Sequence, residues 1–208
     1  MALNSPQALG KLTTYLVSSG SPLYSGRAFD TYGANRSDPF AITGDDIVAV
    51  SMLSMEVKAK TKSGITPEAA IRLEERSVEV TALLMTLPDA CQLHEPDADQ
   101  VDKFLLDEKS PGRQLLALVR EILSDEEGAT TKWVASRKLV GRKRPHLIPI
   151  KDSRAVKKLG DADDWWKAWW EALRFGSENV ARLSALRSAA NANHLSLLRV
   201  ADIVVWMG

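Results

Sequence analysis

The sequence predicts an all-α fold. Apolar residues recur at helical spacing along most of its 208 residues, and capping residues precede several of these runs. No pair of alternating apolar runs joined by a tight turn indicates a β-hairpin. The composition, with 45% hydrophobic and 26% charged residues, is typical of a globular domain that buries its own core. We therefore expect a single all-α domain over residues 1–208.

Four helices are expected in the N-terminal part, residues 1–110. Ser5 and Thr66 each precede a proline, the usual order of an N-cap and a first helical residue, and Thr43 is a capping residue of the same kind. Residues 19–42 are rich in Ser, Gly, Asn and Pro, so we expect a long ordered loop there. The predicted helices cover residues 6–16, 44–55, 67–86 and a short stretch around 104–105.

The middle segment, residues 111–160, is expected to alternate helices with turns. Ser110 again precedes a proline, and Gly128 marks a turn. Residues 145–150 contain two prolines and are expected to form an extended bridge. The predicted helices cover residues 111–123 and 133–141, followed by one that begins at Asp152 or Ser153 and ends at Leu159.

Three more helices are expected in the C-terminal part, over residues 163–175, 178–190 and 195–207. The first carries four tryptophans on one wide face, at positions 165, 166, 169 and 170. Such a face either stacks on nucleobases or packs in the core, and the acidic residues before it favour the core because they would repel phosphate. The last helix is apolar nearly all round, which indicates a core helix or a partner interface.

The net charge of zero conceals a strongly basic segment. Residues 132–158 contain ten basic residues and one acid, so this segment carries +9 and the rest of the chain −9. Such a block favours a surface that binds a polyanion, although a solvated helix face has the same composition. The basic residues are Lys132, Arg137, Lys138, Arg142, Lys143, Arg144, Lys151, Arg154, Lys157 and Lys158.

Several functional classes are excluded or disfavoured by what the sequence lacks. Cys91 is the single cysteine, which excludes a disulfide framework and an iron–sulfur cluster, and the three histidines lack metal-ligand spacing. Neither a P-loop nor a dinucleotide glycine motif is present, so we expect no cofactor and no bound metal. No apolar run is long enough to span a membrane and no signal peptide is visible. We expect a soluble, cytoplasmic protein without a membrane partner.

The most informative segment follows Gly128. A turn that presents backbone N–H groups before a helix binds phosphate well, and hydroxyl and ammonium groups around it add donors. We therefore expect DNA as the partner, held through contacts to its backbone. The expected DNA-binding residues are Gly128, Thr130, Thr131, Lys132, Lys138, Arg142, Lys143, Arg144 and Arg154.

This segment resembles the helix–hairpin–helix DNA glycosylases, the superfamily of endonuclease III and 8-oxoguanine glycosylase. Residues 128–132 (GATTK) resemble the family's Gly-Val-Gly-x-Lys hairpin, with Thr130 in place of the second glycine, and residues 149–154 (PIKDSR) resemble its Pro-Val-Asp-Thr-His-Val motif. Residues 143–152 (KRPHLIPIKD) are also similar to the core of an uncharacterised actinobacterial domain family. The resemblance implies a helix–hairpin–helix element near residues 115–142.

The resemblance also implies an activity and roles for single residues. Asp152 would be the essential carboxylate of a DNA glycosylase, which stabilises the sugar cation or orients water as the damaged or modified base departs. Lys132 would form a Schiff base in a bifunctional enzyme, but we favour a monofunctional one. The excised base needs an aromatic pocket, and its expected lining is Trp133, Tyr24, Phe29 and Tyr32.

Two other functions fit the same sequence. Asp152 precedes a helix, where aspartate is common as an N-cap alone, so the chain is also consistent with a non-catalytic DNA-binding module. An all-α protein-interaction domain that docks a partner through its last helix is the third hypothesis. The three differ in whether DNA binds and in whether Asp152 is needed for turnover.

Overall fold

The computed structural model confirms the all-α prediction: helices form the regular structure of the residues it describes. These are residues 7–17, 23–53, 65–124, 132–175 and 177–208. The elements, in which η2 and η3 are 3₁₀ turns and η4 is a π turn, are α1 (Ala8–Leu16), η2 (Ser25–Ala28), η3 (Ala34–Arg36), α2 (Gly44–Ser51), α3 (Pro67–Glu75), α4 (Ser77–Thr86), α5 (Ala98–Val101), η4 (Asp102–Leu106), α6 (Pro111–Leu123), α7 (Lys132–Lys143), α8 (Ser153–Leu159), α9 (Trp165–Arg174), α10 (Ser177–Ala189) and α11 (Leu197–Trp206).

Most predicted capping residues begin the helices expected of them. Thr66, Ser110 and Asp152 accept hydrogen bonds from backbone N–H groups in the first turns of α3, α6 and α8. Thr43 precedes α2, and its backbone N–H donates to Asp46 at 2.8 Å. The predicted N-cap Ser5 lies outside the described residues. Local sequence signals therefore place these helix starts correctly.

The helix predicted over residues 44–55 ends at Ser51, and the short one predicted around 104–105 lies in the π turn η4. Two further differences concern charged residues. The helix expected over residues 67–86 is interrupted at Arg76, whose backbone (φ −101°, ψ 19°) separates α3 from α4. The Arg76 side chain pairs there with Glu79 and Glu121. Helix α7 continues to Lys143, two residues beyond its predicted end, so Arg142 and Lys143 belong to its last turn. This extension changes where their side chains lie.

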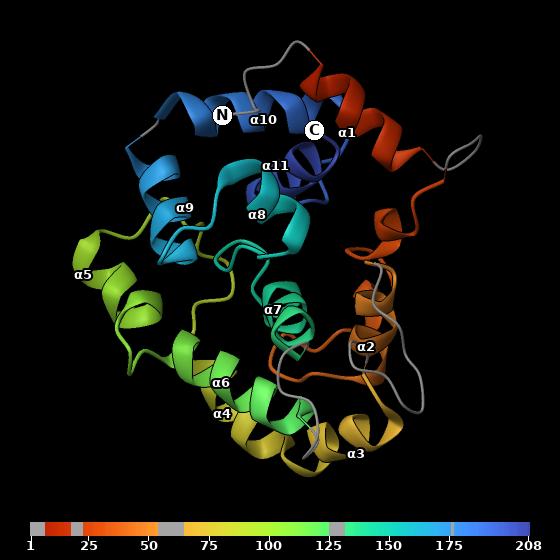
Figure 1. Cartoon of the computed structure of the whole chain (residues 1–208), viewed down its shortest axis with the longest axis vertical. Helices are drawn as coiled ribbons and strands as arrows, with labels where there is room; N and C mark the ends of the chain where they lie inside the picture. The colour runs from red at the N-terminus through yellow and green to blue at the C-terminus, as the bar shows by residue number, and fades with distance from the viewer. Residues whose placement is uncertain (1–6, 18–22, 54–64, 125–131, 176) are drawn as a thin grey trace.

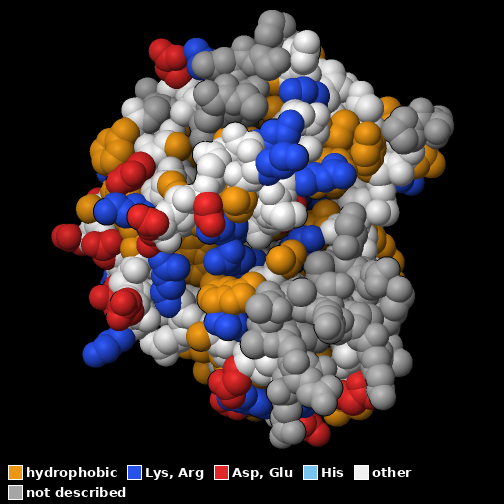
Figure 2. Space-filling model, viewed as in Figure 1, with side chains coloured by type: hydrophobic (Ala, Val, Ile, Leu, Met, Phe, Trp, Pro, Cys, Tyr) orange, Lys and Arg blue, Asp and Glu red, His pale blue; other side chains and the backbone are white. Residues whose placement is uncertain are grey.

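The helices form two groups that meet across the middle of the molecule (Figure 1). In the first, which we call the terminal lobe, α1 packs on α10 and α11, and α11 packs on α8, so elements near both ends of the chain lie together. In the second, the central lobe, α6 packs on α3, α4 and α7, while α2 packs on α7. Lys and Arg side chains gather on one face over α6, α7 and α8 (Figure 2).

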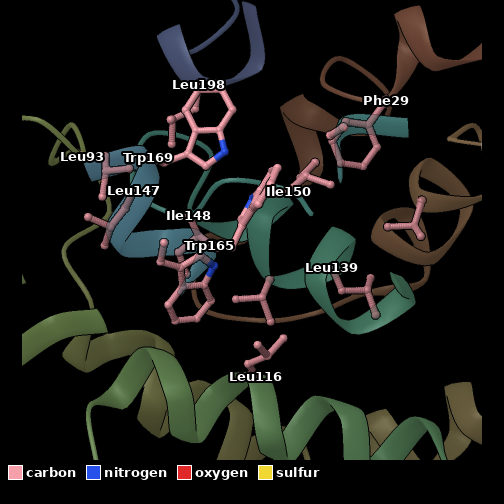
Figure 3. Close-up of a cluster of buried hydrophobic side chains, with 14 of the residues drawn as sticks. Phe29, Leu93, Leu116, Leu139, Leu147, Ile148, Ile150, Trp165, Trp169 and Leu198 are labelled. Atoms are coloured by element: carbon pink, nitrogen blue, oxygen red, sulfur yellow. The ribbon is translucent and has the colours of Figure 1, made fainter. Parts of the chain in front are cut away.

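A shared core joins the lobes around the bridge that follows α7. Residues 147–150 are buried, and Ile148 and Ile150 lie among side chains from α7, α9 and α11 (Figure 3). All four tryptophans of α9 are at most 5% exposed, which confirms their assignment to the core. Residues 197–205 of α11 are buried as well, so the last helix is a core helix and not the exposed partner surface of the third hypothesis.

Candidate functional site

A cavity of about 150 Å³ opens between the lobes. Helix α11 forms one side of it, the segment that contains η2 forms another, and Asp152 enters it from the start of α8. Asp152 and Asp202 are the two carboxylates in its lining. The lining residues are Tyr15, Leu23, Tyr24, Ser25, Gly26, Met52, Leu53, Ile150, Asp152, Arg199, Asp202, Ile203 and Trp206.

Three aromatic rings form one wall of this cavity. Tyr15 and Tyr24 are stacked, with ring centroids 5.5 Å apart and planes inclined by 18°. Trp206 meets both rings edge-on, at 6.0 Å from Tyr15 and 5.8 Å from Tyr24. Such a wall offers flat apolar surface to a planar ligand.

Arg199 holds the inner end of the cavity together. Its guanidinium donates to Asp30 at 2.9 Å, to the hydroxyl of Tyr15 at 2.9 Å and to Asp202. It also donates to the carbonyl of Gly26, where an added Cβ would overlap the Tyr15 hydroxyl. Arg199 thereby links α1, η2 and α11, and it fixes the position of Tyr15.

The second carboxylate of the cavity, Asp202, is buried. The pKa of Asp202 is raised to about 6, chiefly by burial and to a smaller extent by the carboxylates of Asp152 and Asp30, while the charge of Arg199 opposes the shift. Removal of a carboxyl group from water disfavours its charged form. The cavity therefore contains two acidic groups in different environments.

The two carboxylate oxygens of Asp152 have different surroundings. Its Oδ1 accepts a hydrogen bond from the N–H of Ala155 at 2.8 Å, which caps α8. Within the described part of the chain, its Oδ2 makes no hydrogen bond. The half-buried carboxylate thus caps a helix and still has an oxygen available in the cavity.

Lys138, an expected DNA contact, lies in the interior. Its side chain is buried, and Nζ donates to the carbonyl of Leu53 at 2.7 Å. Burial lowers the pKa of Lys138, while the charges of Asp152 and Asp202 oppose that shift. The prediction of a phosphate contact was wrong because this face of α7 packs toward the cavity.

The basic residues at the end of α7 are also buried, which corrects their predicted role at a DNA surface. Arg142 and Lys143 both pair with the carboxylate of Asp46, at 2.9 and 2.6 Å. Arg142 also donates to the carbonyls of Phe29 and Tyr32. The two cations therefore attach the loop before α2 to α7 instead of contacting phosphate.

Arg144 is completely buried, so its predicted DNA contact was wrong as well. Its guanidinium donates to four backbone carbonyls, which compensates for its removal from water. These belong to Leu84, Leu87, Pro39 and Lys143. Arg144 joins the end of α4 to the segment before α2.

Of the four residues expected to line a base pocket, only Tyr24 lines this cavity. Phe29 is 1% exposed and lies under Arg142, whose guanidinium is 5.4 Å from its ring centroid. Tyr32 is half-buried in the loop held by Arg142. Trp133 lies at the contact of α6 and α7, beneath Arg120.

The predicted hairpin is only partly described. Gly128, Thr130 and Thr131 lie outside the described residues, as does the side chain of Lys132, whose backbone begins α7. Helices α6 and α7 pack closely against one another. The helix–hairpin–helix element itself stays a prediction.

A cationic surface adjoins the cavity. Arg154, Lys157 and Lys158 are exposed on α8 and line an open hollow of about 410 Å³. Tyr24 and Trp206 line both this hollow and the cavity, so the two are adjacent. The guanidinium of Arg154 lies 4.2 Å from the centroid of the Trp206 ring. Of the expected DNA contacts with a described side chain, Arg154 alone is exposed.

The residues of the cavity lie within a known protein family. The sequence model of a family of unknown function (DUF6308) matches residues 8–208. The chain belongs to this family. No curated protein and no solved structure matches it. The description of DUF6308 names no activity.

The family match covers every residue of the cavity, several of which the sequence did not single out. Tyr15 and Trp206 occupy apolar stripes that are equally typical of a core helix. The sequence indicated more clearly that Arg199 and Asp202 belong to a site, because they are the charged residues of an otherwise apolar last helix. An i, i+3 ion pair in such a helix indicates a buried polar site.

Two properties of the described residues concern membranes and metals. No described helix is long and apolar enough to cross a membrane. Among the described residues, His, Cys, Asp and Glu side chains form no group of three suited to a metal ion. The cavity and the adjoining hollow provide two carboxylates, an aromatic wall and a cationic surface.

Proposed function

We propose that the protein is a DNA glycosylase that hydrolyses the N-glycosidic bond of a damaged or modified base, with Asp152 as the essential carboxylate. One observation carries the proposal: a carboxylate lies in an aromatic-walled cavity that adjoins an exposed cationic surface. The resemblance of residues 149–154 to the glycosylase motif is consistent with this assignment of Asp152.

The cavity has the size and the walls that a single base needs. The cavity of about 150 Å³ has room for a ring the size of benzene, which is the size of the six-membered ring of a base, and an extruded base needs a closely fitting pocket. Tyr24 and Trp206 lie where the cavity meets the outer hollow, so they are placed to stack on an entering base. Stacking of this kind offsets part of the cost of unpairing.

Asp152 provides the charge that the reaction requires. As the bond between the base and C1′ of deoxyribose lengthens, positive charge develops on the sugar, and a nearby carboxylate stabilises it. Water then adds to C1′ and loses a proton, while the departing base gains one, so that the products are a free base and an abasic sugar. The oxygen of Asp152 left free by the helix cap is the group available for this role.

The cationic surface of α8 replaces the DNA contacts that the sequence indicated. Arg154, Lys157 and Lys158 are exposed beside the entrance, whereas Arg142, Lys143 and Arg144 are interior. Phosphate contacts hold a DNA strand in place without reading its sequence. The proposal therefore assigns strand positioning to α8 and base selection to the cavity.

A base-release assay on damaged and on hypermodified DNA tests the proposal. Abasic sites are scored after alkali, with wild type beside Asp152→Asn and an exposed control, Asp161→Asn. We expect release by wild type and by the control, and none by Asp152→Asn, although this variant still binds DNA. The same assay without alkali shows whether the strand is also cut, as a Schiff-base enzyme would do.

A non-catalytic DNA-binding module is the second candidate, since Asp152 is an N-cap in the structure. Binding without release on any substrate, with equal affinity for wild type and Asp152→Asn, would favour this candidate. Absence of DNA binding would refute both functions.

A further inference from the structure

Trp133 lies beneath two arginines, away from the cavity. The guanidinium carbon of Arg120, from α6, is 3.8 Å from the centroid of the Trp133 ring, and that of Arg137, from α7, is 5.0 Å from it. Stacking on an indole uses the face of a guanidinium and leaves its N–H groups free to bind other acceptors. Both arginines are therefore held in place with donors still available.

A third guanidinium shares this surface. Arg113 and Arg120 are seven residues apart in α6, which places them on one face of the helix after two turns. Burial and the charges of Arg113 and Arg120 lower the pKa of Arg137, while Asp161 opposes the shift. We call Arg113, Arg120 and Arg137 the arginine cluster.

The acidic residues near the arginine cluster do not neutralise its positive charge. Asp164 pairs with Arg113, and Asp161 pairs with Lys151. In the described ranges, no carboxylate lies within 4.0 Å of the guanidinium nitrogens of Arg120 or Arg137. Like charges held together repel one another, and a bound anion relieves that repulsion. The planar fork of a guanidinium matches the two oxygens of a phosphate.

The arginine cluster and the cationic surface of α8 belong to the same broad face. Blue side chains occur over α6 and α7 and again over α8 (Figure 2). Two separate cationic sites on one face suit an anion with charges repeated along its length. We propose that the arginine cluster binds phosphates of the DNA strand whose base enters the cavity. The identity of this polymer rests on the proposed function.

Salt dependence of DNA binding tests the inference. Affinity for a short duplex is measured across a salt series for wild type, for Arg120→Gln/Arg137→Gln and for a control, Arg36→Gln/Arg182→Gln. The control removes two exposed, ion-paired arginines from η3 and α10. Each lost phosphate contact reduces the slope of log K against log salt by about 0.9. We expect a reduction of about one to two for the cluster variant and none for the control.

Base release at saturating DNA separates this inference from the proposed function. We expect the cluster variant to retain the wild-type rate there, since its residues lie outside the cavity. An unchanged slope with base release intact overturns the inference alone. If the slope is reduced in the cluster variant but neither wild type nor any variant releases a base, the glycosylase proposal is refuted and the phosphate site is still supported. If the double variant unfolds, Arg120→Gln alone is expected to reduce the slope by about one.

Discussion

Asp152 and Asp202 line one cavity from two different helices: Asp152 caps α8, and Asp202 lies within α11. Their surroundings differ, because Asp152 is half-buried at a helix end, whereas Asp202 is buried beside Arg199. Because their environments differ, we expect Asp202 to affect the pH dependence of stability and Asp152 to affect base release.

Asp202 makes stability depend on pH in an unusual direction. Its pKa in the folded chain is about 6, above the value of about 4 for an unfolded aspartate. The folded state thus binds this proton more tightly than the unfolded state does. The resulting stabilisation is fully present below about pH 4 and is lost as the pH rises through 6. We expect Asp202→Asn to remove a slope of up to about 1.4 kcal/mol per pH unit from the free energy of unfolding.

Denaturant unfolding across this pH range measures the slope for wild type, for Asp202→Asn and for the exposed control Asp161→Asn. The control is expected to follow wild type. Identical pH profiles for wild type and Asp202→Asn would show that Asp202 does not titrate in this range.

Asp152→Ala is expected to be less stable than Asp152→Asn. Alanine removes the acceptor for the N–H of Ala155, at a cost of about 1 kcal/mol, whereas asparagine is an equally good N-cap. Thermal or denaturant unfolding measures this difference. Base release is expected to be lost in both variants. If the two variants were equally stable, the capping role of Asp152 would be contradicted, while its proposed role in base release would be unaffected.

Arg144 is expected to be essential for folding and not for contact with DNA. Arg144→Met leaves several buried carbonyls without donors, so the free energy of unfolding should fall by at least about 3 kcal/mol. Arg144→Lys should rescue little of this, because an ammonium group lacks the planar fork.

Arg154→Gln is the matched control for Arg144→Met. It removes an exposed arginine from α8, so it should change stability by no more than about 0.5 kcal/mol while weakening DNA binding. A stable, folded Arg144→Met that binds DNA less tightly would reverse the two assignments.

Trp206→Ala tests the aromatic wall. Loss of a stacking partner costs about 1–3 kcal/mol per base, so the rate of base release should fall about tenfold to a hundredfold. Duplex affinity should change much less, because it depends on phosphate contacts. Phe175→Ala, which removes an aromatic side chain that is 73% exposed and outside the cavity, is the control. Equal loss in both variants would exclude a stacking role for Trp206.

Features encoded by neighbouring residues were predictable from the sequence. Thr66 and Ser110 begin helices because a cap and a following proline act within one turn. The tryptophans of α9 share one face because of helical spacing, and the acids before them indicated the core correctly.

Features that depend on distant residues were not predictable in this way. The sequence around Arg142 resembles a surface block, yet its partner Asp46 lies 96 positions earlier. Composition alone does not distinguish a cation that binds phosphate from one that binds a buried carboxylate. The cavity has the same origin, since Tyr15, Asp152 and Trp206 become neighbours only when the terminal lobe assembles.

The pairing of α1 with α11 affects how the protein is made. A chain that leaves the ribosome from its N-terminus presents Tyr15 early, but Arg199, which holds the Tyr15 hydroxyl, is translated 184 positions later. Until then α1 lacks its main packing partners, and the apolar side chains of Leu12 and Tyr15 have no core to enter. Nascent chains that stop before α11 are thus expected to be inactive and to require chaperones, even though they already contain Asp152.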